Sequence, residues 1–229
     1  QTSTALALML LDMGFEKGDY FATSLPLLTE HIFLEYACFK IGVVFVPLDL
    51  RLKGPEVIRS LALVQAKGYA FLGQTAVADF RELGKAVQAH CPFVQHFVQF
   101  SAPDQTIEGA INAFALAAEA KALGEAAATG QATELLARYG AARAATAEED
   151  GCLVIFTTGS TGYPKPALLS HRAITCQNMC LGAAFGIQGA ARMLVNLPPS
   201  HVGCQTEQLM TPFFYGGTVV TLHLFDPAK

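Results

Sequence analysis

The chain has 229 residues, of which 52% are hydrophobic and 15% charged, and its formal net charge at pH 7 is −4. A negative charge argues against a nucleic-acid polymer as partner, because binding a polyphosphate requires a surplus of lysine and arginine. The apolar run from Ile32 to Leu48 contains Glu35 and Lys40, and no uncharged apolar stretch reaches about eighteen residues, so no membrane span is predicted.

Apolar helical and strand patterns alternate along the chain. Helices are predicted at residues 2–13, 28–41, 54–66, 75–89, 106–121, 131–143, 172–184 and 204–214. Strands are predicted at residues 20–24, 43–46, 69–72, 93–99, 153–157, 167–170, 192–196 and 218–223. This alternation predicts an α/β fold with layered, largely parallel sheets flanked by helices. The alanine-rich stretch 109–149 has a charged end, which marks a predicted division between residues 1–149 and 150–229.

A loop rich in hydroxyl groups follows the apolar run from Leu153 to Phe156, which is predicted to be a buried strand. Its residues are Thr157, Thr158, Gly159, Ser160, Thr161, Gly162, Tyr163, Pro164, Lys165 and Pro166. Glycines let backbone N–H groups approach an anion closely, hydroxyls add donors, and the lysine adds a positive charge. The next residues, Ala167 to His171, have the pattern of a second strand. The segment therefore predicts a strand–loop–strand unit that lies across the phosphates of a nucleotide.

The alternative phosphate-binding pattern is the Walker loop, G-x-x-x-x-G-K-[ST]. Counting from Gly159, Pro164 stands where that pattern has glycine, and Pro166 stands where it has serine or threonine. Prolines on both sides of Lys165 also disfavour the helix that a Walker lysine opens. A plain Gly/Ser/Thr-rich surface turn is the other alternative, but few such turns combine this density of hydroxyls with Pro-Lys.

The loop resembles the phosphate-loop signature [ST]-[ST]-G-[ST]-T-G-x-P-K-G of the adenylate-forming (AMP-binding) superfamily, and it departs at Pro166, where the family has glycine. That superfamily contains acyl-CoA synthetases, nonribosomal peptide adenylation domains and firefly-type luciferases. Further segments are similar to its motifs, at residues 18–22, 37–48, 196–201, 216–220 and 225–227. The resemblance covers most of the chain, and it implies the N-terminal large domain of such an enzyme, incomplete at its start.

The resemblance implies an AMP-forming carboxylate–CoA ligase that uses ATP, Mg²⁺ and coenzyme A. A carboxylate attacks the α-phosphorus of ATP, which gives an acyl-adenylate and pyrophosphate, and a thiol then displaces AMP. The residues that it assigns to the β- and γ-phosphates are Thr157, Thr158, Gly159, Ser160, Thr161, Gly162 and Lys165. It places His201, Val202 and Gly203 at the pocket for the acid. Taken alone, a histidine at this position fits a hydrogen-bonded loop residue equally well.

The family's ligands for adenine, ribose and magnesium, its distal lysine and its C-terminal lid domain have no counterpart that we find in this sequence. We therefore expect a fragment that is inactive alone, with no catalytic residue assigned within it. Its expected partners are a small carboxylic acid, ATP, coenzyme A and the remainder of its own polypeptide. Two alternatives stay open, an adenylating enzyme that loads a carrier protein and a noncatalytic nucleotide-binding or scaffold protein.

Six cysteines are spread along the chain without a C-x-x-C pair. Such pairs are the usual signature of a structural zinc site, so no metal site is predicted. No basic segment followed by an apolar core and a cleavage site appears, and isolated cysteines are typical of a reducing compartment. We therefore expect a cytoplasmic location.

Overall fold

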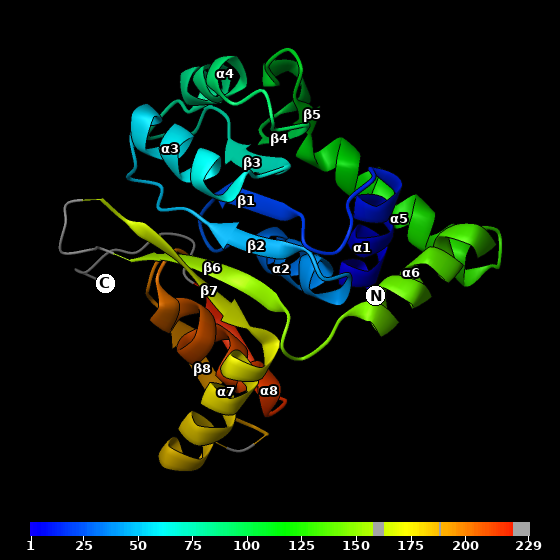
Figure 1. Cartoon of the computed structure of the whole chain (residues 1–229), viewed down its shortest axis with the longest axis vertical. Helices are drawn as coiled ribbons and strands as arrows, with labels where there is room; N and C mark the ends of the chain where they lie inside the picture. Colours follow the sequence, from blue (N-terminus) through cyan, green and yellow to red (C-terminus); the bar gives the residue numbers. More distant parts are fainter. Residues whose placement is uncertain (158–162, 188, 222–229) are drawn as a thin grey trace.

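One seven-stranded sheet runs through the centre of the molecule (Figure 1). The computed structural model describes residues 1–157, 163–187 and 189–221. The strands of the sheet are β1 (Tyr20–Ser24), β2 (Val44–Pro47), β3 (Gly68–Leu72), β4 (His96–Phe100), β5 (Ile111–Asn112), β6 (Gly151–Thr157) and β7 (Lys165–Ser170). They are arranged in the order β5-β4-β3-β1-β2-β6-β7, and all neighbours are parallel except β6 and β7. The predicted α/β fold with largely parallel strands is confirmed.

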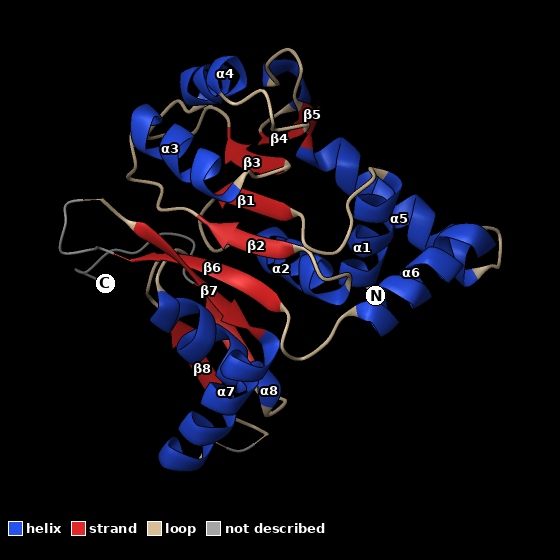
Figure 2. Ribbon diagram, in the orientation of Figure 1, coloured by secondary structure: helices blue, strands red, loops and turns tan. Residues whose placement is uncertain are grey.

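Helices cover both faces of this sheet (Figure 2). They are α1 (Thr2–Asp12), α2 (Thr29–Lys40), α3 (Gly54–Val64), α4 (Arg81–His90), α5 (Ala113–Ala128), α6 (Thr133–Ala145) and α7 (His171–Phe185). Phe45 of β2 packs in the core with α1 and α2, whereas its neighbours Val44 and Val46 pack in the core with α3 and α4. Both faces of the strand are buried, which explains why β2 lies in a continuous apolar run.

A second, smaller sheet follows α7. Its parallel strands are β8 (Arg192–Val195) and β9 (Thr218–Thr221), and a π-helix (Gly203–Met210) and α8 (Thr211–Phe214) lie between them in sequence. The predicted division at residue 150 falls just before β6, which pairs with β2 through Phe45 and Leu153. The large sheet thus crosses this boundary, and the division into residues 1–149 and 150–229 stays a prediction.

Three predicted helices differ from the observed elements. The helix predicted at 75–89 begins only at Arg81, because Gln74 and Asp79 form an isolated bridge around a turn. The helix predicted at 106–121 begins after Asn112, whose side-chain oxygen accepts hydrogen bonds from the N–H groups of Phe114 and Ala115 and thus caps α5. A short 3₁₀ turn (Pro103–Gln105) and β5 precede it. The helix predicted at 204–214 is divided into the π-helix and α8.

No helix among the described residues has the length and apolar character that crossing a lipid bilayer requires.

Candidate functional site

The two strands predicted to flank the phosphate loop are present as β6 and β7. Thr157 is the last residue of β6 and Lys165 the first of β7, and the two are direct antiparallel partners. The Thr157 hydroxyl donates to the Lys165 carbonyl oxygen at 3.4 Å, and both residues are exposed. Thr158, Gly159, Ser160, Thr161 and Gly162, which are also predicted to bind phosphate, lie outside the described residues. The structure therefore fixes the two ends of the predicted phosphate loop.

Pro166, the departure from the family signature, lies within β7 opposite Phe156. Since β7 is the last strand of the sheet order, one of its sides has no partner strand within the described sheet. An edge strand tolerates proline, which cannot donate a ladder hydrogen bond. Pro166 is therefore accommodated by the sheet, and it follows Lys165 without interrupting β7.

The loop that carries His201 lies at the same edge of the sheet. Asp49 follows β2, and Arg51 donates to both carboxylate oxygens at 2.9 and 2.6 Å. These bonds lower the pKa of Asp49, and the Ser200 hydroxyl lowers it further, against partial burial, which raises it. Ser200 is therefore beside the carboxyl end of β2. In open α/β sheets, ligands bind outside the carboxyl ends of the strands.

His201 is exposed at the start of the π-helix, with Val202 and Gly203 after it. Its Nδ1 atom accepts a hydrogen bond from the Gly203 N–H at 3.0 Å, so the neutral ring carries its proton on Nε2. A Cβ atom at Gly203 would lie 3.1 Å from Leu197 Cδ1 and 3.2 Å from His201 Nδ1. This close approach favours glycine. The role of His201, Val202 and Gly203 in an acid pocket stays a prediction.

Sequence reasoning missed the two glutamines that hold this loop. Gln205 is fully buried, and its side-chain amide donates to the Pro199 carbonyl at 2.8 Å. The Gln208 side-chain oxygen accepts from the N–H groups of Asn196 and Leu197, each at 3.2 Å. The signal in the sequence was the pair of glutamines directly after the loop at residues 197–203.

His171 lies at the other end of β7, away from Lys165. It is the first residue of α7, and its ring packs edge-on against Phe39 of α2 with centroids 5.7 Å apart. Burial lowers the pKa of His171, and the nearby Asp150 opposes this. This histidine therefore fixes the β7–α7 junction against α2, and its contacts do not reach the loop end at Lys165.

The exposed groups at the loop ends fit an anionic ligand, because a lysine ammonium and a hydroxyl are donors to phosphate oxygens. The described residues contain no group of three His, Cys, Asp or Glu side chains that could hold a metal ion.

The family model of AMP-binding enzymes matches residues 1–229. The chain belongs to the AMP-binding enzyme family. The long-chain-fatty-acid–CoA ligase FadD13 of Mycobacterium tuberculosis is 25% identical over 96% of this chain and 38% of its own length. The medium-chain fatty-acid–CoA ligase of Escherichia coli is 27% identical over 98% of this chain and 37% of its own length. The chain thus spans less than two-fifths of these relatives.

A solved structure shows the same fold. The inhibitor-bound N-terminal domain of FACL13 from Mycobacterium tuberculosis superposes on all of this chain with a TM-score of 0.70, at 22% identity and over 50% of that chain. The seven-stranded sheet and its helices are therefore those of the N-terminal domain of adenylate-forming enzymes. The family is one of ATP-dependent, AMP-forming ligases.

Proposed function

We propose that this chain is the phosphate-binding and acid-binding part of an AMP-forming carboxylate–CoA ligase. The observation that carries the proposal is the pairing of Thr157 with Lys165 at the carboxyl end of β6, within a chain that matches the AMP-binding family along its whole length. The pairing gives the predicted loop two fixed ends at the edge of the sheet where ligands bind.

In the proposed reaction, the carboxylate oxygen of the acid attacks the α-phosphorus of ATP and the bond to the β-phosphate oxygen breaks. Pyrophosphate leaves, and negative charge builds on its bridging oxygen. The Lys165 ammonium and the donors of Thr158, Gly159, Ser160, Thr161 and Gly162 stabilise that charge. The Thr157 hydroxyl joins them by turning its single proton from the Lys165 carbonyl to a phosphate oxygen. Preorganised donors of this kind provide the main contribution of the protein to phosphoryl chemistry. Mg²⁺, when bound, would neutralise part of the phosphate charge.

The proposed acid has an apolar acyl or aryl body. The segment that leads into the π-helix is rich in apolar residues, and its end at His201, Val202 and Gly203 borders the proposed pocket. Val202 is 41% exposed, so its apolar side chain is available for contact with a substrate. Pockets of this kind hold ligands by shape and desolvation, with a few polar groups that set orientation.

The test is acid-dependent pyrophosphate release by the full-length protein, with ATP, Mg²⁺ and a panel of aliphatic, aromatic and dicarboxylic acids. We expect release with an apolar acid and a thioester product when coenzyme A is added. Transfer only to a phosphopantetheinyl carrier domain would favour the carrier-loading alternative. ATP binding without release with any acid would favour the noncatalytic alternative. A preference for small polar amino acids would contradict the proposed acid class.

A further inference from the structure

An arginine from α3 lies over the aromatic ring next to the phosphate loop. The guanidinium carbon of Arg59 is 3.9 Å from the centroid of the Tyr163 ring. This is within the range of a cation–π interaction, and the planar guanidinium also stacks on an aromatic face. The two residues are far apart in the sequence, and Tyr163 stands two residues before Lys165.

Helix α3 is a firmly held platform for Arg59. Val57, Leu61 and Val64 of this helix are buried in the core beneath the sheet, whereas Arg59 is exposed on its other side. The helix start is fixed as well, because the Lys53 N–H donates to the Glu56 carboxylate at 2.7 Å. Through its contact with Arg59, Tyr163 is therefore held by a helix that is anchored in the core of the domain.

The partner of Arg59 distinguishes it from the arginines that form ion pairs. Arg51, Arg81 and Arg172 each pair with an aspartate or glutamate. Within the ranges that the structure describes, the Arg59 side chain has no carboxylate within ion-pair distance, and its recorded partner is the Tyr163 ring.

The chain between Tyr163 and Lys165 is stiff. Pro164 fixes its own φ angle, and a residue that precedes proline is restricted to extended conformations. Lys165 is already paired with Thr157 in the sheet. A displacement of the Tyr163 ring is therefore transmitted to the backbone that carries the Lys165 ammonium, with little freedom to absorb it.

We infer that Arg59 is a positioning residue for the phosphate loop. By stacking on Tyr163 it holds the loop end from residue 163 to 165, so that the Lys165 ammonium meets the phosphates of ATP in the reactive position. The inference rests on the proposed function. Arg59 acts through Tyr163, and no contact between Arg59 and the nucleotide is part of it.

The test is a double-mutant cycle in the full-length protein with Arg59→Ala, Tyr163→Ala and the double variant. Each single variant should lower kcat/KM for ATP about two- to fivefold, the range of an exposed cation–π pair, and leave the KM for the acid and the Tm unchanged. The double variant should be no worse than the single variants, because each one removes the same contact. Arg59→Lys and Tyr163→Phe should keep most of the activity.

A matched control is Arg143→Ala. Arg143 lies 5.9 Å over the Tyr139 ring on α6, remote from the loop, and its loss should leave kcat/KM for ATP unchanged. Multiplicative effects in the double variant would overturn the inference, since they would mean that Arg59 acts on ATP without Tyr163. An equal loss in Arg143→Ala would overturn it as well.

Hydrogen exchange provides a readout that does not depend on turnover. Arg59→Ala should increase amide exchange in the peptide that spans residues 157–165 and leave the remaining peptides of the sheet unchanged. Unchanged exchange in that peptide would overturn the inference whatever the activity. If wild type is active and the variants keep its kcat/KM for ATP, only the role of Arg59 is contradicted. If wild type releases no pyrophosphate, the proposed function is contradicted.

Discussion

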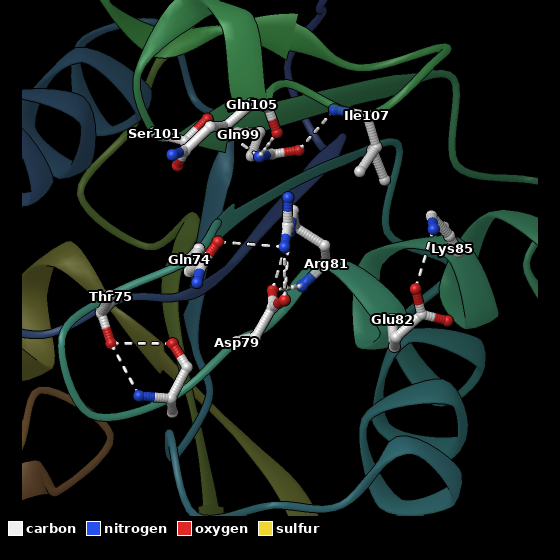
Figure 3. A network of polar contacts seen from close by, with 11 residues as sticks. Gln74, Thr75, Asp79, Arg81, Glu82, Lys85, Gln99, Ser101, Gln105 and Ile107 are labelled. Atoms are coloured by element: carbon white, nitrogen blue, oxygen red, sulfur yellow. Dashed lines mark hydrogen bonds and ion pairs between the residues drawn. The ribbon is translucent and has the colours of Figure 1, made fainter.

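Two groups of loops lie at the carboxyl edge of the large sheet. In the loops after β3 and β4, the closed side, the polar groups bond to one another; in the segments after β6 and β8, the open side, they are exposed. The loops after β3 and β4 close on themselves. Arg81 donates to Asp79 and Gln74, and the Thr75 hydroxyl bonds to Ala78 (Figure 3). By contrast, Lys165 and His201, in the segments after β6 and β8, are exposed. At one and the same edge, internally satisfied loops are structural, and exposed donors mark the candidate ligand site.

The buried side-chain amide of Gln99 satisfies several polar groups of the closed side. Its nitrogen donates to the Ser101 hydroxyl and the Gln105 carbonyl, each at 2.9 Å, and its oxygen accepts from the Ile107 N–H at 2.9 Å (Figure 3). A single side chain thus satisfies three groups of the loop after β4. A loop held in this way has no donor left for a ligand at Gln99.

The largest expected effect comes from the open side. Lys165→Ala in the full-length protein should reduce the rate of pyrophosphate release about 100- to 1,000-fold, because one donor to developing charge contributes roughly 2.7–4 kcal/mol. The Tm should stay unchanged, since the side chain is exposed. Release is measured at saturating acid and ATP.

Lys121→Ala is the matched control, because Lys121 is an exposed lysine of α5. It should keep the wild-type rate. Equal rates in Lys165→Ala and wild type would contradict the assignment of the open side as the phosphate site.

The second effect tests the closed side. Gln99→Met keeps a similar volume but leaves the Ile107 N–H and its other partners without Gln99. It should lower the free energy of unfolding by about 1–3 kcal/mol, the cost of unsatisfied buried polar groups. Urea unfolding measures the loss. At a temperature where the variant is folded, the rate of pyrophosphate release should match that of wild type. A loss of rate in the folded variant would contradict the structural role of this loop.

The sequence predicted the sheet better than the segments around it, for a physical reason. The apolar pattern that buries Phe45 on one face and Val44 on the other is local, so this strand could be predicted from the sequence alone. Helix starts depend on single side chains. The turn at Thr75 and the cap at Asn112 make α4 and α5 begin later than predicted. Such local competition between turn and helix is weakly encoded.

The paired strands at the two ends of the predicted phosphate loop were expected from the apolar runs around its hydroxyl- and glycine-rich segment. The support of the loop was not, because the stacking of Arg59 on Tyr163 joins residues far apart in the chain. The π-helix was also missed, since its periodicity over residues 203–210 differs little from that of an α-helix in so short a segment. The sequence thus predicts candidate site residues, whereas the contacts that position them require the fold.

The third expected effect comes from a buried carboxyl group of α2. Glu35 of α2 is fully buried, and its carboxylate oxygens have no hydrogen-bond partner in the described part of the chain. Burial raises the pKa of Glu35 well above 4.5, and burial lowers the pKa of His31 to about 3. Folding thus keeps a proton on Glu35 and keeps His31 neutral.

The sign of the pH dependence follows from the two groups. Between pH 3 and 6.5 the unfolded chain binds a proton at His31 that the native protein does not, so stability rises with pH there. Above 4.5 the native protein retains a proton on Glu35 that the unfolded chain releases, so stability falls with pH. Of these two effects only the second remains above pH 6.5, and its slope reaches at most about 1.4 kcal/mol per pH unit, for as long as the native protein keeps the proton on Glu35.

Glu35→Gln removes the titrating group and should flatten this fall. Urea unfolding of wild type and variant at pH 7 and 8 measures the two slopes. His31→Gln should leave the slope above pH 6.5 as in wild type, since His31 is neutral in both states there. Parallel slopes for wild type and Glu35→Gln would show that Glu35 is ionised in the native protein.

The smallest expected effect returns to the open side, at the start of the π-helix. Gly203→Ala places a methyl group 3.1 Å from Leu197 Cδ1 and 3.2 Å from His201 Nδ1, so both side chains must move by a few tenths of an ångström. The hydrogen bond from residue 203 to His201 uses the backbone N–H and is retained. The shift should raise the KM for the largest accepted acid up to about tenfold, the low end of what one methylene changes in a pocket. Small acids and ATP should keep their KM values. If all acids lose equally, or if the KM for ATP changes instead, then His201 belongs to the phosphate site and does not border the acid pocket.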